Sequence, residues 1–131
     1  MAYPIEESEV EKTEKQLGAK LPEAYRKSMI EENGKNFIIT EEDEWELFPL
    51  KDASNRKKLA RTAYDILKET ESALNWPNFP KDSIVIANNG MGDLLFLKKD
   101  EKNFEDTIYA FWHETGEVKR FAESFDELER E

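Results

Sequence analysis

The second half of this chain contains four short apolar segments in succession, with no helical periodicity between them. They occupy residues 83–87, 94–98, 107–112 and 117–121, and Glu114-Thr115-Gly116 supplies the turn between the last two. Segments of this length and composition are typical of β-strands, and strands joined by short connections pair antiparallel. This part of the sequence therefore predicts an antiparallel sheet, around which the rest of the chain must fold.

The first half of the chain shows helical periodicity in two short stretches. Ser8 and Glu11 have the spacing of a capping box, so a first helix is expected to begin there and to end at Gly18. Leu21-Pro22 is expected to begin a second helix, with the proline in its first turn, and Asn33-Gly34 is expected to end it. These two helices are expected to pack against each other as a hairpin.

Further elements follow from the local pattern. Residues 37–39 and 45–50 are expected to be strands on either side of an acidic connection. From Ser54, as N-cap, to Asn75 the chain has the apolar stripe of one long helix, and residues 124–128 are expected to form a final capped helical turn. The chain is therefore expected to have an α+β fold, with a mainly antiparallel sheet flanked by helices.

The composition limits the chemistry. The length fits one domain, residues 1–131, and 38% hydrophobic residues are enough for a single small core. Cysteine is absent and His113 is the only histidine, which excludes disulfides, a thiolate nucleophile and a metal site with two histidines. We therefore expect no catalysis and no metal or other cofactor, and an ordinary hydrogen-bonding or exposed role for His113.

Acidic residues dominate the charge. With 30 Asp and Glu against 19 Lys and Arg, the net charge is −11, which disfavours direct binding to nucleic acid or to an anionic membrane and favours a basic partner. The N-terminus lacks the pattern of a secretory signal, and no apolar run approaches the roughly 20 residues that cross a bilayer. A cytoplasmic location is expected. The basic residues between Arg56 and Lys68 are expected to form a solvated helix face or to match the acidic residues within the molecule.

The loop from Asn88 to Asp93 contains Gly90 and Gly92 and has the composition of a phosphate-binding loop. Such a loop needs a helix after it, whose N-terminal N–H groups bind the anion, whereas a strand pattern follows here. Asparagine and aspartate oxygens also suit calcium, but the spacing of an EF-hand is missing. A tight hairpin turn with positive-φ glycines, capped by Asp93, is the favoured interpretation.

The acidic run Glu41-Glu42-Asp43-Glu44 precedes Trp45 and has two interpretations. Contiguous acids at a turn are usually solvated surface, and they do not hold two carboxylates across a substrate as a hydrolase requires. Acids beside an aromatic residue also form recognition patches, because the acids attract Lys and Arg of a partner and the ring supplies buried area. Both interpretations stay open from the residues alone.

Several segments occur together in one order and spacing along nearly the whole chain. They are Leu17-Gly18, Leu21-Pro22 with Tyr25, Asn33-Gly34, Trp45 with Leu47-Phe48-Pro49-Leu50, Ile84 to Leu97 with its two glycines, Trp112-His113-Glu114, Gly116-Glu117-Val118 and Ser124-Phe125-Asp126-Glu127-Leu128. In this order they resemble the SUKH superfamily, which includes the fungal Smi/Knr cell-wall synthesis regulators and many bacterial proteins.

The resemblance implies an α+β fold with helices around a mainly antiparallel sheet. It also implies a function, since bacterial members are chiefly immunity proteins that bind and neutralise polymorphic toxins, often nucleases, encoded beside them. Fungal members are signalling scaffolds with long disordered extensions, which are not expected in this compact chain. We therefore expect an immunity protein that covers the active or substrate-binding surface of a cognate toxin, with a nuclease domain as the expected class. A protein- or peptide-binding module of the same fold is the alternative.

Two sets of residues are singled out by these considerations. The first set is expected to contact the partner: Glu41, Glu42, Asp43, Glu44, Trp45, Asp93, Trp112 and Glu114. The second set is expected to maintain the fold: Leu21, Pro22, Tyr25, Gly90, Gly92, Ser124 and Phe125. Exposed strand edges leave a homodimer open as well.

Overall fold

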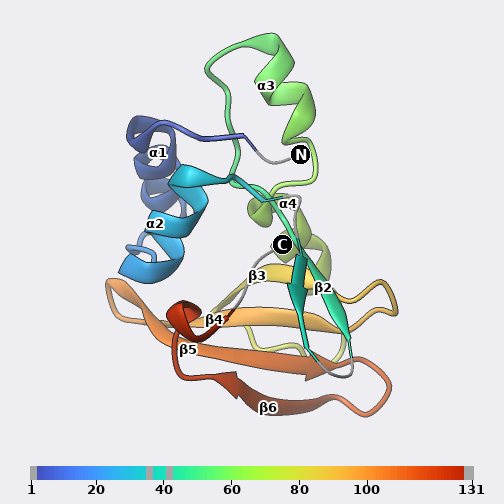
Figure 1. Ribbon diagram of the computed structural model, residues 1–131. Coiled ribbons are helices and arrows are strands. Elements are labelled where there is room, and N and C mark those ends of the chain that lie inside the picture. Colours follow the sequence, from blue (N-terminus) through green and yellow to red (C-terminus); the bar gives the residue numbers. More distant parts are fainter. Residues whose placement is uncertain (1–2, 35–36, 41–42, 129–131) are drawn as a thin grey trace.

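The computed structural model describes residues 3–34, 37–40 and 43–128. Its centre is a six-stranded antiparallel sheet in the order β1-β2-β3-β4-β5-β6, so each strand pairs with its neighbours in sequence (Figure 1). The strands are β1 (Phe37–Ile39), β2 (Glu44–Leu47), β3 (Ser83–Asn88), β4 (Leu94–Asp100), β5 (Asn103–Trp112) and β6 (Glu117–Ala122). The predicted antiparallel sheet and α+β fold are confirmed.

The sheet is strongly curled, so that strands distant in the order face each other. In a flat sheet β2 and β5 would lie about 14 Å apart, which is three strand spacings. The Trp45 ring of β2 nevertheless lies 5.9 Å from the Trp112 ring of β5 and 5.5 Å from the Phe121 ring of β6, measured between centroids. These edge-to-face contacts are favourable, and they close the concave side of the sheet around an aromatic cluster.

Two helices, α1 (Glu7–Leu17) and α2 (Glu23–Glu31), lie beside the sheet (Figure 1). Glu14 of α1 joins them, because its carboxylate accepts hydrogen bonds from the Leu21 N–H (2.8 Å) and from the Arg26 side chain (3.3 Å). The buried backbone donor at the start of α2 is thereby satisfied by a side chain of α1. The order of helix, short connection and helix agrees with the sequence-based expectation.

The helix ends differ in part from the prediction. The predicted capping box is wrong, because Glu6 is the N-cap of α1, no side chain caps it, and Ser8 lies within the helix. Pro22 is the N-cap of α2 rather than a residue of its first turn. Gly18 ends α1 as predicted, with a left-handed φ of 70°.

The single long helix expected after Ser54 is in fact two helices, α3 (Arg56–Arg61) and α4 (Ile66–Ala73). Asp65 begins the second helix. Its buried carboxylate accepts hydrogen bonds from the N–H groups of Leu67 (2.9 Å) and Lys68 (3.0 Å), which a continuous helix would direct to carbonyl groups of the preceding turn. A buried cap thus overrides the continuous apolar stripe, and the prediction of one helix is wrong.

The two helices differ in how they meet the rest of the molecule. α3, which is capped by Asn55 rather than Ser54, buries none of its residues and projects at the far end of the molecule from the sheet (Figure 1). α4 buries Ile66, Thr70 and Ala73. Thr70 also bonds directly to the sheet, because its hydroxyl accepts a hydrogen bond from the Val85 N–H of β3 at 2.8 Å. α4 is therefore anchored to the sheet, whereas α3 is exposed.

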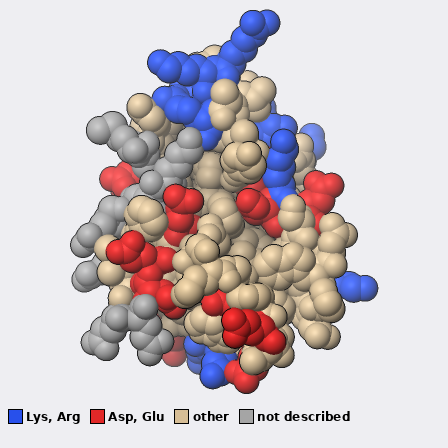
Figure 2. Space-filling model, turned by 90° about the vertical axis from the view of Figure 1, so that its right-hand side faces the viewer, with Lys and Arg blue, Asp and Glu red and all other residues tan. Residues whose placement is uncertain are grey.

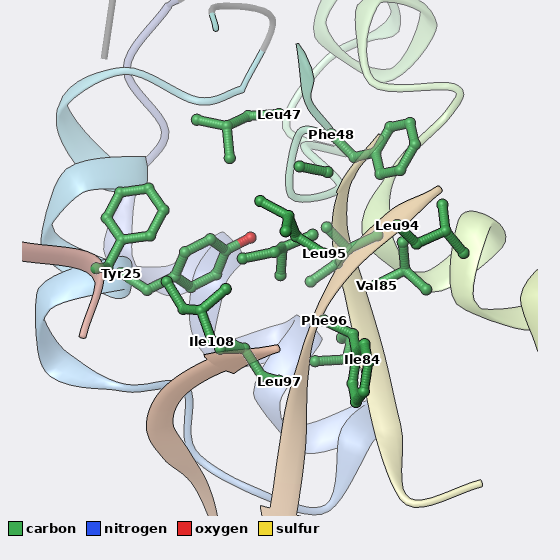
Figure 3. Close-up of a cluster of buried hydrophobic side chains, with 14 of the residues drawn as sticks. Tyr25, Leu47, Phe48, Ile84, Val85, Leu94, Leu95, Phe96, Leu97 and Ile108 are labelled. Carbon is green, nitrogen blue, oxygen red and sulfur yellow. The ribbon is translucent and has the colours of Figure 1, made fainter. Parts of the chain in front are cut away.

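The central strands β3 and β4 carry most of the core, and residues 83–87 and 94–97 are buried on both faces. On one face the Phe79 ring lies 5.4 Å from the Phe96 ring. On the other face Tyr25 of α2 points into the cluster (Figure 3). Strands covered on both faces read as continuous apolar runs, which explains why this part of the sequence predicted strands so clearly.

The C-terminal turn completes this face. It is a 3-10 turn, η1 (Phe125–Glu127), and Ser124 precedes it without a side-chain cap, so the predicted capped turn is wrong in that detail. Phe125 is buried, and its ring lies 5.2 Å from the Tyr25 ring in an edge-to-face contact. Tyr25 and Phe125 thus join α2 to η1, and Leu21 is buried in the same core cluster.

Candidate functional site

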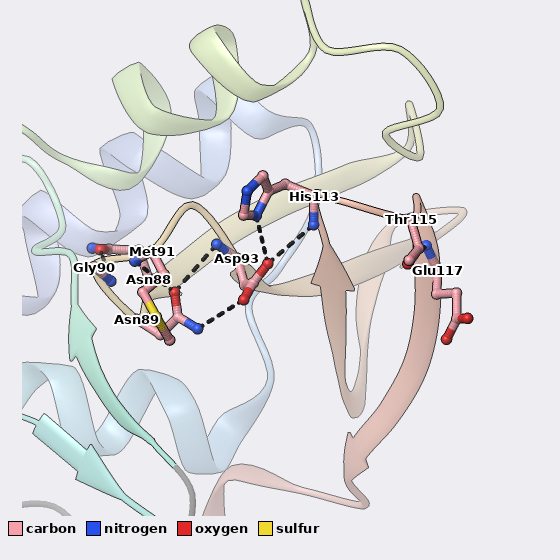
Figure 4. A network of polar contacts seen from close by, with 8 residues as sticks. All are labelled: Asn88, Asn89, Gly90, Met91, Asp93, His113, Thr115 and Glu117. Carbon is pink, nitrogen blue, oxygen red and sulfur yellow. Dashed lines mark hydrogen bonds and ion pairs between the residues drawn. The ribbon is translucent and has the colours of Figure 1, made fainter.

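The loop between β3 and β4 is a turn held by its own side chains (Figure 4). Asn88 Oδ1 accepts a hydrogen bond from the Gly90 N–H (2.8 Å). Asn89 Oδ1 accepts from the N–H groups of Met91 (2.9 Å) and Asp93 (3.2 Å). Gly90 has a φ of 79°, as predicted for a hairpin glycine. These backbone donors are occupied by asparagine oxygens, so they are not presented to a phosphate group.

Asp93 joins this turn to the end of β5. Its Oδ2 accepts a hydrogen bond from the Asn89 side chain (2.9 Å), and its Oδ1 accepts from the His113 N–H (3.0 Å) and lies 2.7 Å from His113 Nδ1. Burial by itself raises the pKa of Asp93, but the hydrogen bonds from Asn89 and His113 outweigh it and hold the pKa below its ordinary value. An ionised carboxylate therefore faces the imidazole. The prediction that Asp93 caps the turn is wrong in its detail, because Asn88 and Asn89 accept the backbone N–H groups of the turn, whereas the Asp93 carboxylate bonds to the Asn89 side chain and to His113.

Gly92 gives the His113 ring its position. Gly92 has a φ of 100°, and a Cβ atom there would lie 3.0 Å from His113 Nδ1 and 3.1 Å from Cε1. The ring thus packs against a backbone that only glycine allows to come so near. Its second nitrogen points away from Asp93 (Figure 4). The imidazole is held by a carboxylate at one edge and by the Gly92 backbone beside it, while its side chain remains 37% exposed.

His113 lines a cleft between the segment that follows α4 and the β5–β6 turn. We call it the His113 cleft and define it by the residues that line it: Trp76, Pro77, Asn78, Gly92, Phe111, His113, Glu114, Thr115 and Gly116. Its apolar walls and few polar groups are typical of ligand-binding clefts in proteins. Among its residues, Glu114 and Gly92 belong to the two sets singled out from the sequence, whereas His113 was expected to have an ordinary hydrogen-bonding or exposed role.

A second surface lies at the opposite edge of the sheet, on β1 and β2. Phe37 pairs with Glu46, and Ile39 pairs with Glu44, so these four side chains share one face of the two strands. Phe37 and Ile39 are 37% and 43% exposed, and both glutamates are exposed as well. We call Phe37, Ile39, Glu44 and Glu46 the edge face. It combines apolar area with negative charge.

The edge face continues into a groove between β2 and the α3–α4 segment, because Glu46 also lines that groove together with Arg61, Tyr64 and Glu69. Tyr64 is 75% exposed. Burial, followed by the charge of Asp65, raises the pKa of Glu69 above its ordinary value. We call this the Tyr64 groove. Figure 2 shows Lys and Arg gathered at the α3 end of the molecule and Asp and Glu spread below it.

The residues predicted to contact a partner are distributed unevenly. Glu41 and Glu42 lie outside the described residues. Asp43 is half-buried in the β1–β2 turn, where its carbonyl accepts a hydrogen bond from the Thr40 N–H at 2.9 Å. Glu44 is exposed on the edge face. The expectation that Trp45 offers an exposed ring is wrong, because Trp45 is 1% exposed. Strand alternation directs its side chain to the concave side, opposite Glu44.

The second predicted group is also divided by burial. Asp93 is 8% exposed and serves the turn and His113, so its carboxylate is not an open contact site. Trp112 is half-buried against Trp45. Glu114 is exposed at the β5–β6 turn and lines the His113 cleft. Of the described residues in the predicted set, Glu44 and Glu114 are therefore the exposed acids.

Several surface residues were not identified from the sequence, namely Phe37, Ile39, Tyr64, Glu69, Trp76 and Asn78. Alternation along 37–39 was a usable signal, since Ile38 facing the core requires Phe37 and Ile39 to face away. Tyr64 and Trp76 carry no such signal, because their positions depend on where α3 and α4 end.

Within the described ranges, no group of three His, Asp or Glu residues could hold a metal ion. None of the helices described is long and apolar enough for a membrane span. Comparison with curated proteins and with solved structures found no match. Comparison with family models matched residues 4–131 to the SMI1 / KNR4 family (SUKH-1), so the match covers nearly the whole chain. The chain therefore belongs to the SMI1 / KNR4 family (SUKH-1).

Proposed function

We propose that this protein is an immunity protein that binds a cognate protein toxin and neutralises it by covering its active or substrate-binding surface. The expected class of toxin is a nuclease domain. Two facts support the proposal: the chain belongs to a family that includes immunity proteins, and its net charge is −11. A nuclease must be basic where it grips phosphate groups, so an acidic inhibitor matches that surface in charge.

The edge face is the observation that carries the proposal. Phe37 and Ile39 expose apolar area, and their strand partners, Glu46 and Glu44, place negative charge beside it. Interfaces combine a central apolar anchor with a charged rim in the same way, since the apolar part gains free energy on burial and the rim gives orientation. The partner side that complements this face carries Lys and Arg around an apolar centre.

The Tyr64 groove extends the same surface toward α3. Tyr64 is the most exposed aromatic residue of the described chain, and Glu46 lines the groove as well as the edge face. Tyrosine is enriched among the residues that dominate binding energy, because its ring offers large area and its hydroxyl a hydrogen bond. We assign the edge face and the Tyr64 groove together as the toxin-binding surface.

Neutralisation by coverage needs no chemical step by this chain. A nuclease active site is blocked when its basic cleft is occupied, because the nucleic acid can no longer approach the catalytic groups. The immunity protein then only has to bind the toxin and keep the nucleic acid out of its active site. Association of an acidic surface with a basic one is also steered electrostatically, which raises the association rate by roughly 10- to 1,000-fold at low salt.

The test is co-expression with each toxin domain encoded beside the gene of this chain. One such toxin is expected to arrest bacterial growth when produced alone, and to be rescued by this chain and to co-purify with it. If no neighbouring toxin is rescued or bound, the proposal fails.

Charge reversal locates the surface in the complex that forms. Glu44→Lys combined with Glu46→Lys is expected to raise the Kd for the toxin by at least about tenfold, since it places positive charge against a basic partner. The matched control is Glu11→Lys combined with Glu31→Lys, which changes the net charge equally on exposed positions of α1 and α2. Equal losses in the two variants would place the toxin elsewhere.

A further inference from the structure

We infer that the His113 cleft receives an arginine side chain of the partner. The inference rests on the proposed function, because it names one contact of the same complex. The cleft shares no residue with the edge face or the Tyr64 groove, since it lies between the β5–β6 turn and the segment after α4. Three features of the cleft argue for a guanidinium group: its walls, its charge and its fixed acceptor.

The walls of the cleft are apolar and aromatic. Trp76, Pro77 and Phe111 line it, and the Trp76 and Phe111 rings lie 6.0 Å apart between centroids. Trp76 is half-buried, so one part of its indole faces the cleft. A planar guanidinium stacks on such a ring face more readily than an ammonium does, because it is flat and more weakly hydrated. The walls thus favour arginine over lysine.

The charge of the cleft is negative. Glu114 is exposed at its rim, and no Lys or Arg is among the described residues that line it. The ionised Asp93 lies directly behind His113, with 2.7 Å between Oδ1 and Nδ1. Anionic ligands are therefore disfavoured, whereas a cation meets one carboxylate at the rim and a second behind the imidazole. The cleft matches a basic partner in the same way as the edge face does.

The fixed acceptor is His113 itself. Asp93 holds the Nδ1 edge of the ring, and Gly92 packs beside it, so in the neutral imidazole Nε2 is left as an oriented acceptor pointing away from Asp93 (Figure 4). A guanidinium has N–H donors on more than one edge. It can donate to His113 Nε2 and to the Glu114 carboxylate while its face lies on Trp76.

Two residues that line the cleft have left-handed backbone conformations. Asn78 has a φ of 68° and Gly116 a φ of 75°, both left-handed. A Cβ atom on Gly116 would lie 3.5 Å from the Asn78 side-chain nitrogen, so the two rims touch at this point. Conformations of this kind cost free energy for residues other than glycine and persist where the surrounding structure requires them. The β5–β6 turn and the segment after α4 therefore approach each other closely at Gly116 and Asn78.

The test is a titration of the full-length ¹⁵N-labelled protein with the peptide acetyl-Gly-Arg-Gly-amide, followed by NMR. We expect saturable shifts of the Trp76 indole N–H and of the backbone N–H groups of Glu114 and Gly116, at millimolar peptide. The same peptide with citrulline in place of arginine, which has the shape of arginine without its charge, is expected to leave these signals unchanged. Equal shifts with the two peptides would overturn the inference.

Two matched variants assign the binding to this cleft. Glu114→Gln is expected to weaken arginine binding about threefold, the effect of one exposed ion pair, and Trp76→Leu is expected to weaken it by a similar factor. Glu117→Gln is the control, since Glu117 is exposed on the same hairpin but pairs with Lys119 outside the cleft. Equal affinities in the Glu114 and Glu117 variants would also overturn the inference.

The outcome separates this inference from the proposed function. If the cleft binds arginine but no neighbouring toxin is captured, the arginine site is supported and the toxin is contradicted as the partner. If a toxin complex forms, its Kd is unaffected by Glu114→Gln and the peptide does not bind, the immunity role is supported and the cleft is not part of the interface.

Discussion

At the scale of single residues, two glycines have the same backbone conformation and very different surroundings. Gly34 has a φ of 69° and Gly90 a φ of 79°. A Cβ atom on Gly34 would lie 2.6 Å from both Cα and N of Pro49, whereas nothing lies within 4 Å of a Cβ on Gly90. Next to Gly34, the buried Asn33 side chain bonds twice to the Leu50 backbone, at 2.7 and 2.9 Å. The end of α2 is thus fixed against the segment after β2.

Substitution of these glycines by alanine is expected to separate conformational strain from close packing. Gly90→Ala is expected to lower the free energy of unfolding by about 1–2 kcal/mol, the cost of a left-handed residue. Gly34→Ala is expected to cost about 1–3 kcal/mol more, because its methyl group also displaces the Pro49 backbone. Urea denaturation of both variants measures the difference. Equal losses in the free energy of unfolding would show that the close approach to Pro49 does not contribute.

The carboxylate of Asp93 predicts a dependence of stability on pH. Because its pKa is lowered in the folded protein, it stabilises the fold above its unfolded pKa, and this contribution is lost as pH falls through the folded pKa. Asp93→Asn is expected to lower the free energy of unfolding by about 2 kcal/mol at pH 7, and by progressively less toward about pH 3. Denaturation experiments across this pH range measure the free energy of unfolding, and Asp106→Asn, at an exposed position, is the control. A difference in the free energy of unfolding between wild type and Asp93→Asn that does not change with pH would contradict the prediction.

At the scale of elements, one hydrogen bond couples α4 to the sheet. The Val85 N–H of β3 donates to the Thr70 hydroxyl of α4, next to a shift in the register between β3 and β4. A buried backbone donor of the strand is thus satisfied by a helix side chain. This bond positions α4, whose C-terminal end leads into the Trp76–Asn78 side of the His113 cleft.

Thr70→Val tests this coupling, because it keeps the shape of the side chain and removes the acceptor. It is expected to lower the free energy of unfolding by about 1–3 kcal/mol, since the buried Val85 N–H loses its partner. Thr70→Ser keeps the hydroxyl and is expected to cost about 1 kcal/mol or less, the value of one methyl group. Hydrogen exchange of the Val85 amide reports the same bond directly. Equal stabilities of the Val and Ser variants would contradict the coupling.

At the scale of the whole molecule, the charge distribution determines how partners approach. The net charge is −11, yet Lys and Arg gather at the α3 end while acids spread below it (Figure 2). α3 buries none of its residues, so its basic side chains remain solvated. A basic partner is therefore attracted first to the exposed glutamates of the edge face, which orients the encounter before contact.

Ionic strength is expected to act mainly on the association rate of the toxin complex. Raising the salt from about 0.05 to 0.5 M shortens the range of screening and is expected to lower the association rate constant at least about tenfold. The dissociation rate constant is expected to change much less. Stopped-flow measurements check this, and in Glu44→Lys with Glu46→Lys the salt dependence is expected to be weaker. An association rate that is independent of salt would rule out electrostatic steering.

Local pattern was sufficient for the elements that depend on near neighbours. The four C-terminal strands, the antiparallel sheet and the hairpin glycines were predicted correctly, because alternation, turn glycines and short connections act within a few residues. The same reasoning predicted one helix after Ser54, although Asp65 breaks it. The apolar stripe continues through the break, and only burial of the Asp65 carboxylate beside two free N–H groups makes the new helix start favourable.

The candidate site was less accessible to sequence reasoning, for a physical reason. Glu44 on the edge face and Glu114 in the cleft were identified from charge and family pattern, whereas Trp45 was assigned to the surface and is buried. Its burial arises from the curl of the sheet, which brings β2 against β5 and β6. The contact of Asp93 with His113 likewise joins residues 20 positions apart in the chain. Such contacts form only when the strands pair in register, so they belong to the folded molecule and not to any stretch of its sequence.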